Sequence, residues 1–350
     1  MHSRVWSCNV STGQTWTVGV TGATGYAGGE VCRLLAGHPN LRLAGVHANS
    51  SAGRRLGELQ PHLLPFAQMT VQPSDVESLS GYDVVVLALP HGESAVIAGQ
   101  LPAETLVIDC GADFRLTDPA AWARWYGGVH AGSWPYGLPE LPGQREQLTG
   151  AKRIAVPGCY PTSVTLALAP ALAAGLVEPD VVVVAASGTS GAGKSAKPHL
   201  LGSEVMGSVS AYGVGGGHRH TPEMVQNLSQ AAGGPVSVSF TPTLVPMSRG
   251  ILATCYAKST APCDPLEILR AAYAGEGFVH VGGASPETKW ATGSNAAFLS
   301  ARYDERTGTI IALAAIDNLG KGAAGQMIQC ANLMLGLDEG AGLTNIGVYP

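Results

Sequence analysis

The sequence is poor in charge and has no long apolar run. Charged side chains are 13% of its 350 residues, and 20 basic against 25 acidic residues give a net charge of −5. Without a basic run, nucleic acid and anionic membranes are poor candidate partners. No apolar stretch reaches about 18 residues, and the polar start lacks the apolar core of a signal peptide. We therefore expect a cytoplasmic protein that binds neither nucleic acid nor membrane.

Paired-cysteine motifs are also missing. The seven cysteines are scattered without a C-x-x-C pair, and an odd number cannot all pair within one chain. We expect reduced thiols and no metal site. Six are interpreted as small buried hydrophobic residues: Cys8, Cys32, Cys110, Cys255, Cys263 and Cys330.

The length and the order of apolar runs predict two domains. Runs at 15–22, 41–47, 82–89 and 106–109 alternate with helical or loop segments, which indicates an α/β, doubly wound (Rossmann) parallel sheet. Later strands at 181–186, 236–243, 250–258, 296–303 and 309–315 indicate an α+β domain. We expect a flexible leader at 1–15, a first domain at 16–157 plus about 318–350, and a second at 158–317. A last helix, 321–337, would return to the first domain.

A glycine-rich turn joins the first predicted strand to a helix that begins at Tyr26. Its G-x-x-G-x-x-G spacing would let backbone N–H groups approach a pyrophosphate at the positive end of the helix dipole. The alternative is a tight structural turn. The candidate cofactor contacts are Gly22, Thr24, Gly25, Tyr26, Ala27 and Gly28.

The end of the second predicted strand lacks the acidic residue that usually holds the ribose of NAD. The chain instead has hydroxyls at Ser50 and Ser51 and a cation at Arg54, followed by Arg55. This set suits a 2′-phosphate, so NADP(H) is favoured over NAD, unless the arginines are merely solvated. Pro90, at the carboxyl end of another parallel strand, is placed to border the same cofactor.

Cys159 lies in V-P-G-C-Y-P-T-S, between a strand and a helix. Unpaired N–H groups at a helix start lower a thiol pKa and can stabilise an oxyanion, so we interpret Cys159 as a nucleophile. The helix is expected to kink or split at Pro170.

A dense polar cluster, G-H-R-H-T-P-E, offers an acid/base for this thiol. Either His218 or His220 could transfer the proton, with the other histidine or Glu223 orienting it. His220 is slightly preferred because it lies closer to the following helix and to Glu223.

At these residues the sequence resembles the N-acetyl-gamma-glutamyl-phosphate reductase family. The resemblance covers about residues 16–336, and its specific part is the pair P-G-C-Y-P-T and H-R-H-x-P-E. The other matching motifs are G-A-T-G-Y-A-G-G-E, A-L-P-H-G-E-S, D-C-G-A-D-F-R-L, Y-G-L-P-E-L, S-G-T-S-G-A-G-K, P-M-S-R-G-I-L-A-T and I-D-N-L-G-K-G-A-A-G-Q.

The resemblance implies an oxidoreductase of arginine biosynthesis that uses NADPH to reduce an acyl phosphate to an aldehyde. The Cys159 thiolate would attack the γ-carbonyl of N-acetyl-glutamyl 5-phosphate, expel phosphate and form a thioester, which hydride reduces to the semialdehyde. The family pattern also suggests a homodimer or homotetramer.

Further site residues follow from the resemblance. Asn318 could hold the nicotinamide carboxamide, and Ser187 and Gly188 belong to a second Gly/Ser loop near nicotinamide or substrate, unless that loop is a flexible turn. Because a doubly anionic substrate needs fixed cations, the substrate contacts would come from the loop and three basic residues, each of which could instead form a surface ion pair: Ser190, Arg115, Lys194 and Arg249.

Three alternatives remain at this point. An aspartate-semialdehyde dehydrogenase shares the chemistry on a shorter acyl phosphate. A reductase of a carrier-bound aminoadipyl phosphate differs only in pocket shape. A non-catalytic NADP-sensing or scaffold protein would have no need of Cys159.

Overall fold

The structure is a computed structural model and describes residues 13–349. The chain forms two compact units, divided between Pro157 and Gly158. We call residues 13–157 with 323–343 the N-terminal unit, and residues 158–322 with 344–349 the central unit. The C-terminal bounds differ from the expected ones, because residues 318–322 and 344–349 group with the central unit. Most of the predicted leader falls on residues 1–12, outside the described residues.

The N-terminal unit contains a five-stranded parallel sheet in the order β2-β1-β3-β4-β5. Its strands are β1 Trp16–Thr21, β2 Leu41–His47, β3 Val84–Leu87, β4 Leu106–Asp109 and β5 Arg153–Ala155. Its helices are α1 Tyr26–Leu35, α2 Leu56–Leu59, α3 Val76–Leu79, α4 Glu93–Ala98, α5 Pro119–Trp125, α6 Gln144–Leu148 and α12 Gly325–Met334. Short 3-10 turns are η1 Asn49–Ser51 and η2 Leu64–Phe66.

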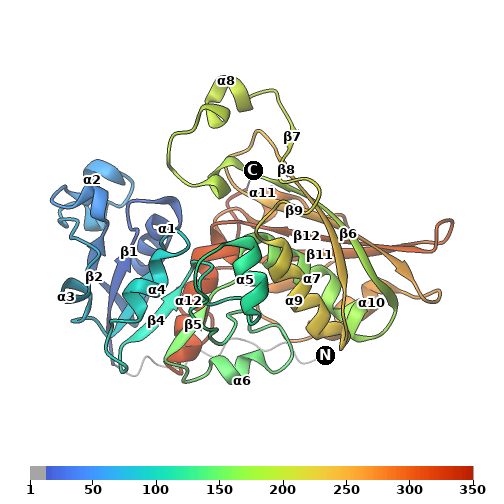
Figure 1. The fold of residues 1–350 in the computed structure, drawn as a ribbon, viewed down its shortest axis with the longest axis horizontal. Helices are drawn as coiled ribbons and strands as arrows, with labels where there is room; N and C mark the ends of the chain where they lie inside the picture. The colour runs from blue at the N-terminus through green and yellow to red at the C-terminus, as the bar shows by residue number, and fades with distance from the viewer. Residues whose placement is uncertain (1–12, 350) are drawn as a thin grey trace. The chain divides into compact units, whose positions relative to one another are not determined.

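Successive residues of β3 enter different cores, because neighbouring side chains on a strand point to opposite faces. Val84 and Val86 belong to the cluster that contains residues of α1 and α12, whereas Val85 and Leu87 belong to the second cluster. Both faces of the sheet are therefore covered, as the apolar runs predicted. Figure 1 shows α12, in red, returning from the end of the chain to this unit.

The central unit contains a seven-stranded mixed sheet in the order β10-β11-β12-β9-β6-β8-β7 (Figure 1). The strands are β6 Val177–Ser187, β7 Ser210–Ala211, β8 Ser237–Leu244, β9 Ile251–Ser259, β10 Val279–Val281, β11 Ala297–Asp304 and β12 Thr309–Ile316. The helical segments are α7 Cys159–Ala173, η3 Thr189–Ala192, η4 Pro198–Leu200, α8 Gly202–Val205, α9 Thr221–Ala232, α10 Pro265–Ala272 and α11 Thr288–Ala291. The predicted combination of a Rossmann unit and an α+β unit is confirmed.

Pro170 was expected to kink or split its helix, and it does not split it. The α7 helix continues through it from Cys159 to Ala173. Proline has no N–H, so the carbonyl of Leu166, four residues earlier, loses its helical donor. The Tyr273 hydroxyl donates to that carbonyl at 2.7 Å and replaces the missing bond. A partner 107 residues away in the sequence therefore satisfies the interrupted helix.

The predicted C-terminal helix, 321–337, consists of two kinds of helix. A π-helix, η5 Gly320–Ala324, comes first and α12 follows it directly. The π-helical turn shows in its hydrogen bond, because the Gly322 N–H donates at 3.0 Å to the carbonyl of Asp317, five residues earlier, instead of four. Within residues 13–349, no helix has the length and apolar character needed to span a bilayer.

Candidate active site

Cys159 is the first residue of α7, and no side chain caps this end of the helix. The preceding Gly158 N–H donates to the buried Glu223 carboxylate at 2.9 Å. The Gly158 carbonyl accepts from both the N–H and the hydroxyl of Thr162 at 3.0 Å. The backbone on the N-terminal side of the cysteine is thus fixed from α9 and from the first turn of α7. A thiol at this position lies where the helix dipole favours a negative charge.

Gly322 packs directly against the cysteine, which sequence reasoning did not anticipate. A Cβ at Gly322 would lie 2.8 Å from the Cys159 Cβ, closer than such atoms approach. Only glycine allows this approach. The glycines of the D-N-L-G-K-G motif were the available signal.

The two predicted histidines occupy different environments. His218 lies in an aromatic cage, with ring centroids 5.4 Å from Tyr160, 5.6 Å from Tyr212 and 5.3 Å from Phe240. Burial, and secondarily Arg219, lowers the pKa of His218 to about 4. Its Nδ1 accepts the backbone N–H of His220 at 3.1 Å, which fits a neutral imidazole.

His220 stands at the N-terminal cap of α9, with its ring centroid 5.0 Å from that of His218 and 6.0 Å from that of Tyr160. Glu223 occupies the first turn of the same helix. Through the neighbours of Cys159 in the chain, Tyr160 and Gly158, both histidines and Glu223 gather at the start of α7 within the central unit.

Two tyrosines in this cluster were not predicted. The Tyr160 and Tyr212 hydroxyls lie 2.8 Å apart. Burial raises the pKa of both phenols, and that of Tyr160 rises strongly. Both stay protonated at neutral pH, next to the candidate nucleophile. Their 52-residue separation gives no local sequence signal.

The second Gly/Ser loop follows β6 and is held by the segment before β9. Backbone N–H groups of Gly188, Thr189 and Ser190 donate to the carbonyls of Gly250, Met247 and Ser248 at 2.9–3.1 Å. A Cβ at Gly188 would come within 2.9 Å of the backbone at 248–249. Ser187 is buried at the end of β6. The predicted candidates in this loop thus lie on a pinned turn, and Lys194 follows in an exposed stretch.

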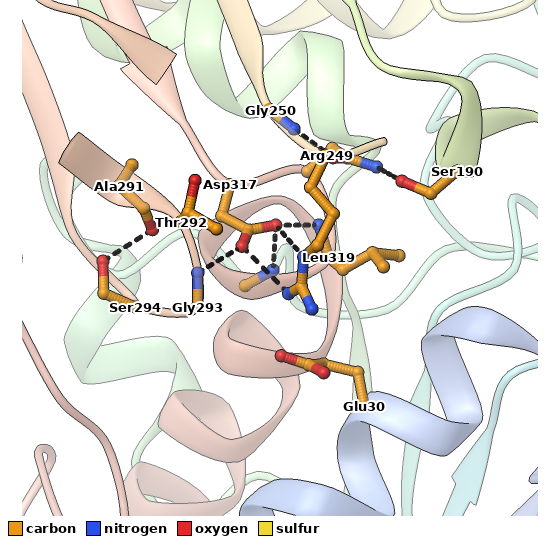
Figure 2. Close-up of polar contacts among 12 residues, drawn as sticks. Glu30, Ser190, Arg249, Gly250, Ala291, Thr292, Gly293, Ser294, Asp317 and Leu319 are labelled. Atoms are coloured by element: carbon orange, nitrogen blue, oxygen red, sulfur yellow. Dashed lines mark hydrogen bonds and ion pairs between the residues drawn. The ribbon is translucent and has the colours of Figure 1, made fainter. Parts of the chain in front are cut away.

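Arg249 and Asn318 join this loop to the end of β12. The Arg249 guanidinium pairs with the buried Asp317 carboxylate through two contacts of 3.1 and 2.9 Å, and Figure 2 shows it directed at Asp317. The Asn318 amide accepts from Gly250 N–H at 2.7 Å and donates to the Ser190 hydroxyl at 3.0 Å. The oxygen and the nitrogen of the Asn318 side chain, which was predicted to hold the nicotinamide, thus both make hydrogen bonds within the protein.

In the N-terminal unit, the glycine turn has the form that a dinucleotide requires. Gly22 has φ +64°, and a Cβ there would lie 2.2 Å from the Ala88 carbonyl oxygen. A Cβ at Gly28 would lie 2.3 Å from the Gly22 carbonyl oxygen. The α1 helix begins without a side-chain cap and without an acidic residue in its first turn. An anionic phosphate therefore fits at this helix start. Gln60, which was not predicted, donates to the Gly25 carbonyl at 2.9 Å and supports the turn.

The neighbouring strand ends carry the other cofactor candidates. Ser50 and Ser51 lie in η1, just after β2. Arg54 is exposed and pairs with Glu58 at 3.1 Å. Pro90 is exposed and follows β3. Because carboxyl ends of parallel strands share one edge of a sheet, these residues lie on the edge that contains the glycine turn.

Arg115 is buried within the N-terminal unit. Its guanidinium donates to the carbonyls of Val156 and Cys110, each at 2.7 Å. It thereby links the chain just after β5 to the chain just after β4. Two hydrogen bonds therefore fix the guanidinium, and one of their acceptors, Val156, lies three residues before Cys159 in the sequence. Among the described residues, no group of three or more histidine, cysteine or acidic side chains could hold a metal ion.

Two family models match the chain. Residues 17–151 match the semialdehyde dehydrogenase NAD binding domain, and residues 159–318 match the semialdehyde dehydrogenase dimerisation domain. Curated relatives named N-acetyl-gamma-glutamyl-phosphate reductase include one from Streptomyces coelicolor, 62% identical over 95% of this chain and 98% of its own length. Another, from Mycobacterium avium, is 58% identical over 95% of this chain and 98% of its own length.

Solved structures share the fold at low sequence identity. Aspartate semialdehyde dehydrogenase II from Vibrio cholerae, complexed with ASA, has a TM-score of 0.69 at 20% identity, covering 92% of this chain and 98% of that one. The NADP complex of aspartate semialdehyde dehydrogenase from Candida albicans has a TM-score of 0.68 at 17% identity, covering 92% and 99%.

Proposed function

Because the chain belongs to the N-acetyl-gamma-glutamyl-phosphate reductase family, we propose that it reduces N-acetyl-glutamyl 5-phosphate to N-acetyl-glutamate 5-semialdehyde and phosphate, in arginine biosynthesis. The observation that carries the proposal is Cys159 at an uncapped helix start, followed by Tyr160, which contacts both histidines, and preceded by an N–H that is bonded to Glu223. Neither a binding module nor a scaffold needs this arrangement.

Cys159 acts as the nucleophile. Its thiolate attacks the γ-carbonyl carbon, and the helix-start N–H groups stabilise the oxyanion that develops. The C–O bond to phosphate breaks, which leaves a thioester on the sulfur. When bound, NADPH supplies the hydride that reduces this thioester. Hydride addition leaves an oxyanion on the thiohemiacetal carbon. Its collapse to the aldehyde breaks the C–S bond, and the departing sulfur takes up a proton.

His220 carries the protons in this scheme. A pKa of about 4 leaves His218 a weak base at neutral pH, and its Nδ1 already accepts the His220 N–H. We assign His218 the role of holding the backbone at His220, and His220 the role of activating the thiol and protonating the departing sulfur. Glu223, bonded to Gly158 N–H, orients the start of α7.

The cofactor is NADP(H). The close turn glycines and the open start of α1 support binding of the pyrophosphate at residues 22–28. Ser50, Ser51 and Arg54 would hold the 2′-phosphate. Arg54→Ala should weaken NADP binding about tenfold and leave NAD binding unchanged, because one charge-assisted contact contributes about 1.4 kcal/mol. Fluorescence titration of each variant with NADP and with NAD measures both affinities. Glu58→Gln, which removes only the partner of Arg54, should retain the preference for NADP in this titration.

The remaining assignments concern the anionic groups of the substrate. Arg115 and Lys194 are proposed ligands of its carboxylate and phosphate, and Ser190 lies on the pinned loop next to Asn318. Ser187 and Gly188 are proposed to border the nicotinamide, together with Pro90. The fixed position of Arg115 supports its role, because a preorganised guanidinium pays little entropy on binding an anion.

One assay tests the function and its rivals. Phosphate-dependent reduction of NADP by N-acetyl-glutamate semialdehyde should be rapid with the wild type and absent with Cys159→Ala, which should still bind NADP. Full activity of Cys159→Ala would refute the thioester mechanism. Faster turnover of aspartate semialdehyde, or of a carrier-bound aminoadipate semialdehyde, would favour a rival substrate. NADP binding without turnover of any of them would indicate a sensor.

We also propose that the enzyme is a cytoplasmic homodimer or homotetramer assembled through the sheet of the central unit. Val182, Val184 and Tyr256 are large apolar side chains, 46%, 41% and 37% exposed, on the adjacent strands β6 and β9. The match of residues 159–318 to a dimerisation domain supports this surface. Val184→Glu should shift the molar mass in light scattering towards the monomer, whereas Lys258→Glu, near the end of β9, should not.

A further inference from the structure

The end of β12 carries a polar hub that the reaction scheme above does not use. Asp317 follows the last residue of β12 and is fully buried. Its Oδ1 accepts from Arg249 Nε at 3.1 Å, Leu319 N–H at 2.9 Å and Gly320 N–H at 3.2 Å. Its Oδ2 accepts from Arg249 Nη2 at 2.9 Å and Gly293 N–H at 2.6 Å. One carboxylate thus joins three separate segments of the central unit (Figure 2).

One of these segments leads to the nucleophile. The Asp317 side chain holds the N–H groups of the two residues that precede Lys321, and its own carbonyl accepts the Gly322 N–H at 3.0 Å. Gly322 is the residue that packs against Cys159. The position of the backbone packed against the Cys159 Cβ therefore depends on the Asp317 carboxylate through one turn of π-helix.

A second segment is the pinned Gly/Ser loop. Asn318, the next residue, bonds the Gly250 N–H and the Ser190 hydroxyl, and Gly250 adjoins Arg249. Arg249 thus fixes Asp317 from the segment before β9 that also holds this loop. The bidentate geometry resists rotation of either side chain.

We propose that Asp317 and Arg249 are positioning residues of the reductase, which fix the backbone at Gly322 against Cys159 and the Gly/Ser loop beside it. The proposal rests on the function proposed above and replaces substrate binding as the role of Arg249. Asn318, through its bonds to Gly250 N–H and the Ser190 hydroxyl, positions the Gly/Ser loop.

The test compares kinetics with thiol accessibility. Asp317→Asn keeps the volume but puts an amide donor opposite N–H donors, so kcat should fall at least about tenfold with KM for the acyl phosphate within about threefold of wild type. Freed from Gly322, Cys159 should react with iodoacetamide at pH 8 at least about threefold faster, because the thiol is more accessible. A loss of activity combined with a more reactive thiol distinguishes positioning from general damage.

Arg249 variants provide the second arm. Arg249→Ala should reproduce both effects, and Arg249→Lys should recover part of kcat because it restores one donor. Arg270→Ala, a matched removal of an exposed arginine paired with Glu267 on α10, should change neither quantity. If Asp317→Asn does not fold, the Arg249 series decides the question.

Two results would overturn the proposal. A KM for acyl phosphate raised at least about thirtyfold with kcat retained in Arg249→Ala would show that Arg249 binds substrate. Unchanged kcat and alkylation in Asp317→Asn would show that the hub does not act on Cys159. If the wild type itself lacks reductase activity, the proposed function fails, whereas the alkylation rates still test the positioning.

Discussion

Two buried aspartates, one in each unit, lie at the carboxyl ends of strands and differ in the number of hydrogen bonds that their carboxylates accept. Asp317 in the central unit receives two donors from Arg249 and three backbone N–H groups. Asp109 ends β4 in the N-terminal unit, and its Oδ1 accepts the Gly111 N–H at 2.7 Å. Its Oδ2 has no hydrogen-bond partner within residues 13–349.

The difference shows in the charge that each site tolerates. Burial raises the pKa of Asp109 to about 6, although Ser94, the Gly111 N–H and Arg115 act in the opposite direction. A carboxylate with few donors is costly to bury, whereas one with a full set can serve as an anchor. Asp109 is therefore a source of pH-dependent stability, whereas Asp317 holds three chain segments together.

The largest effect on stability is expected from removing the Asp317 carboxylate. Asp317→Ala leaves the Arg249 guanidinium and three backbone N–H groups without their acceptor, which should lower the free energy of unfolding by about 3–5 kcal/mol. Urea denaturation followed by circular dichroism measures the loss. A change below about 1 kcal/mol would mean that the carboxylate contributes no more than a surface group.

Asp109→Asn should have the opposite sign. A carboxyl whose folded pKa is raised binds more protons when folded, so stability falls as pH rises from about 3.8 to about 6. The amide keeps the bond from Gly111 N–H and carries no charge. The variant should gain up to about 3 kcal/mol over wild type at pH 8, and the gain should vanish near pH 4. Equal stability of the two proteins across this range would contradict the comparison.

His218 shows that the central unit also contains a poorly compensated ionisable group. Its folded pKa, about 4, lies below the ordinary value of 6.5, so its contribution to stability is complete above pH 6.5 and falls as the pH drops towards 4. The loss should reach at most about 1.4 kcal/mol per pH unit. His218→Gln retains an acceptor for His220 N–H and should flatten this slope in thermal unfolding. A slope as steep as in wild type would assign the acid sensitivity to other groups.

The smallest effect on stability is expected at an exposed ion pair. Arg54 and Glu58 form an i,i+4 pair with side chains 54% and 52% exposed. Removing Arg54 should change the free energy of unfolding by less than about 0.5 kcal/mol, because solvent screens such pairs. A loss above about 1 kcal/mol would show that exposure is a poor guide to the value of these contacts.

Local chemistry was readable in the sequence, and distant chemistry was not. The turn at Gly22 and the position of Cys159 follow from glycine, proline and strand signals within about ten residues. The bond from Gly158 N–H to Glu223 spans 65 residues, and the Arg249–Asp317 pair spans 68. Such pairs depend on the order of strands in a mixed sheet, which no periodicity encodes. Arg249 was predicted either to bind substrate or to form a surface ion pair, and its buried partner Asp317 was not predicted.

Pro170 shows how a tertiary contact can offset a local rule, because the helix that was expected to kink or split there is not split. Proline removes a helical donor, and that alone indicates a kink. Tertiary structure supplied another donor from Tyr273, so the helix continued.

Because the Tyr273 hydroxyl replaces the backbone N–H that Pro170 lacks, the residues at positions 170 and 273 cannot change independently during evolution. Tyr273→Phe alone leaves the Leu166 carbonyl buried without its donor, at a cost of about 1–3 kcal/mol. Pro170→Ala supplies a backbone N–H to the same carbonyl, and then the phenol is dispensable. The order of events therefore matters: a lineage can lose the tyrosine freely only after it has lost the proline. Homologous chains without proline at this position should vary at position 273, and those with it should retain a hydroxyl donor.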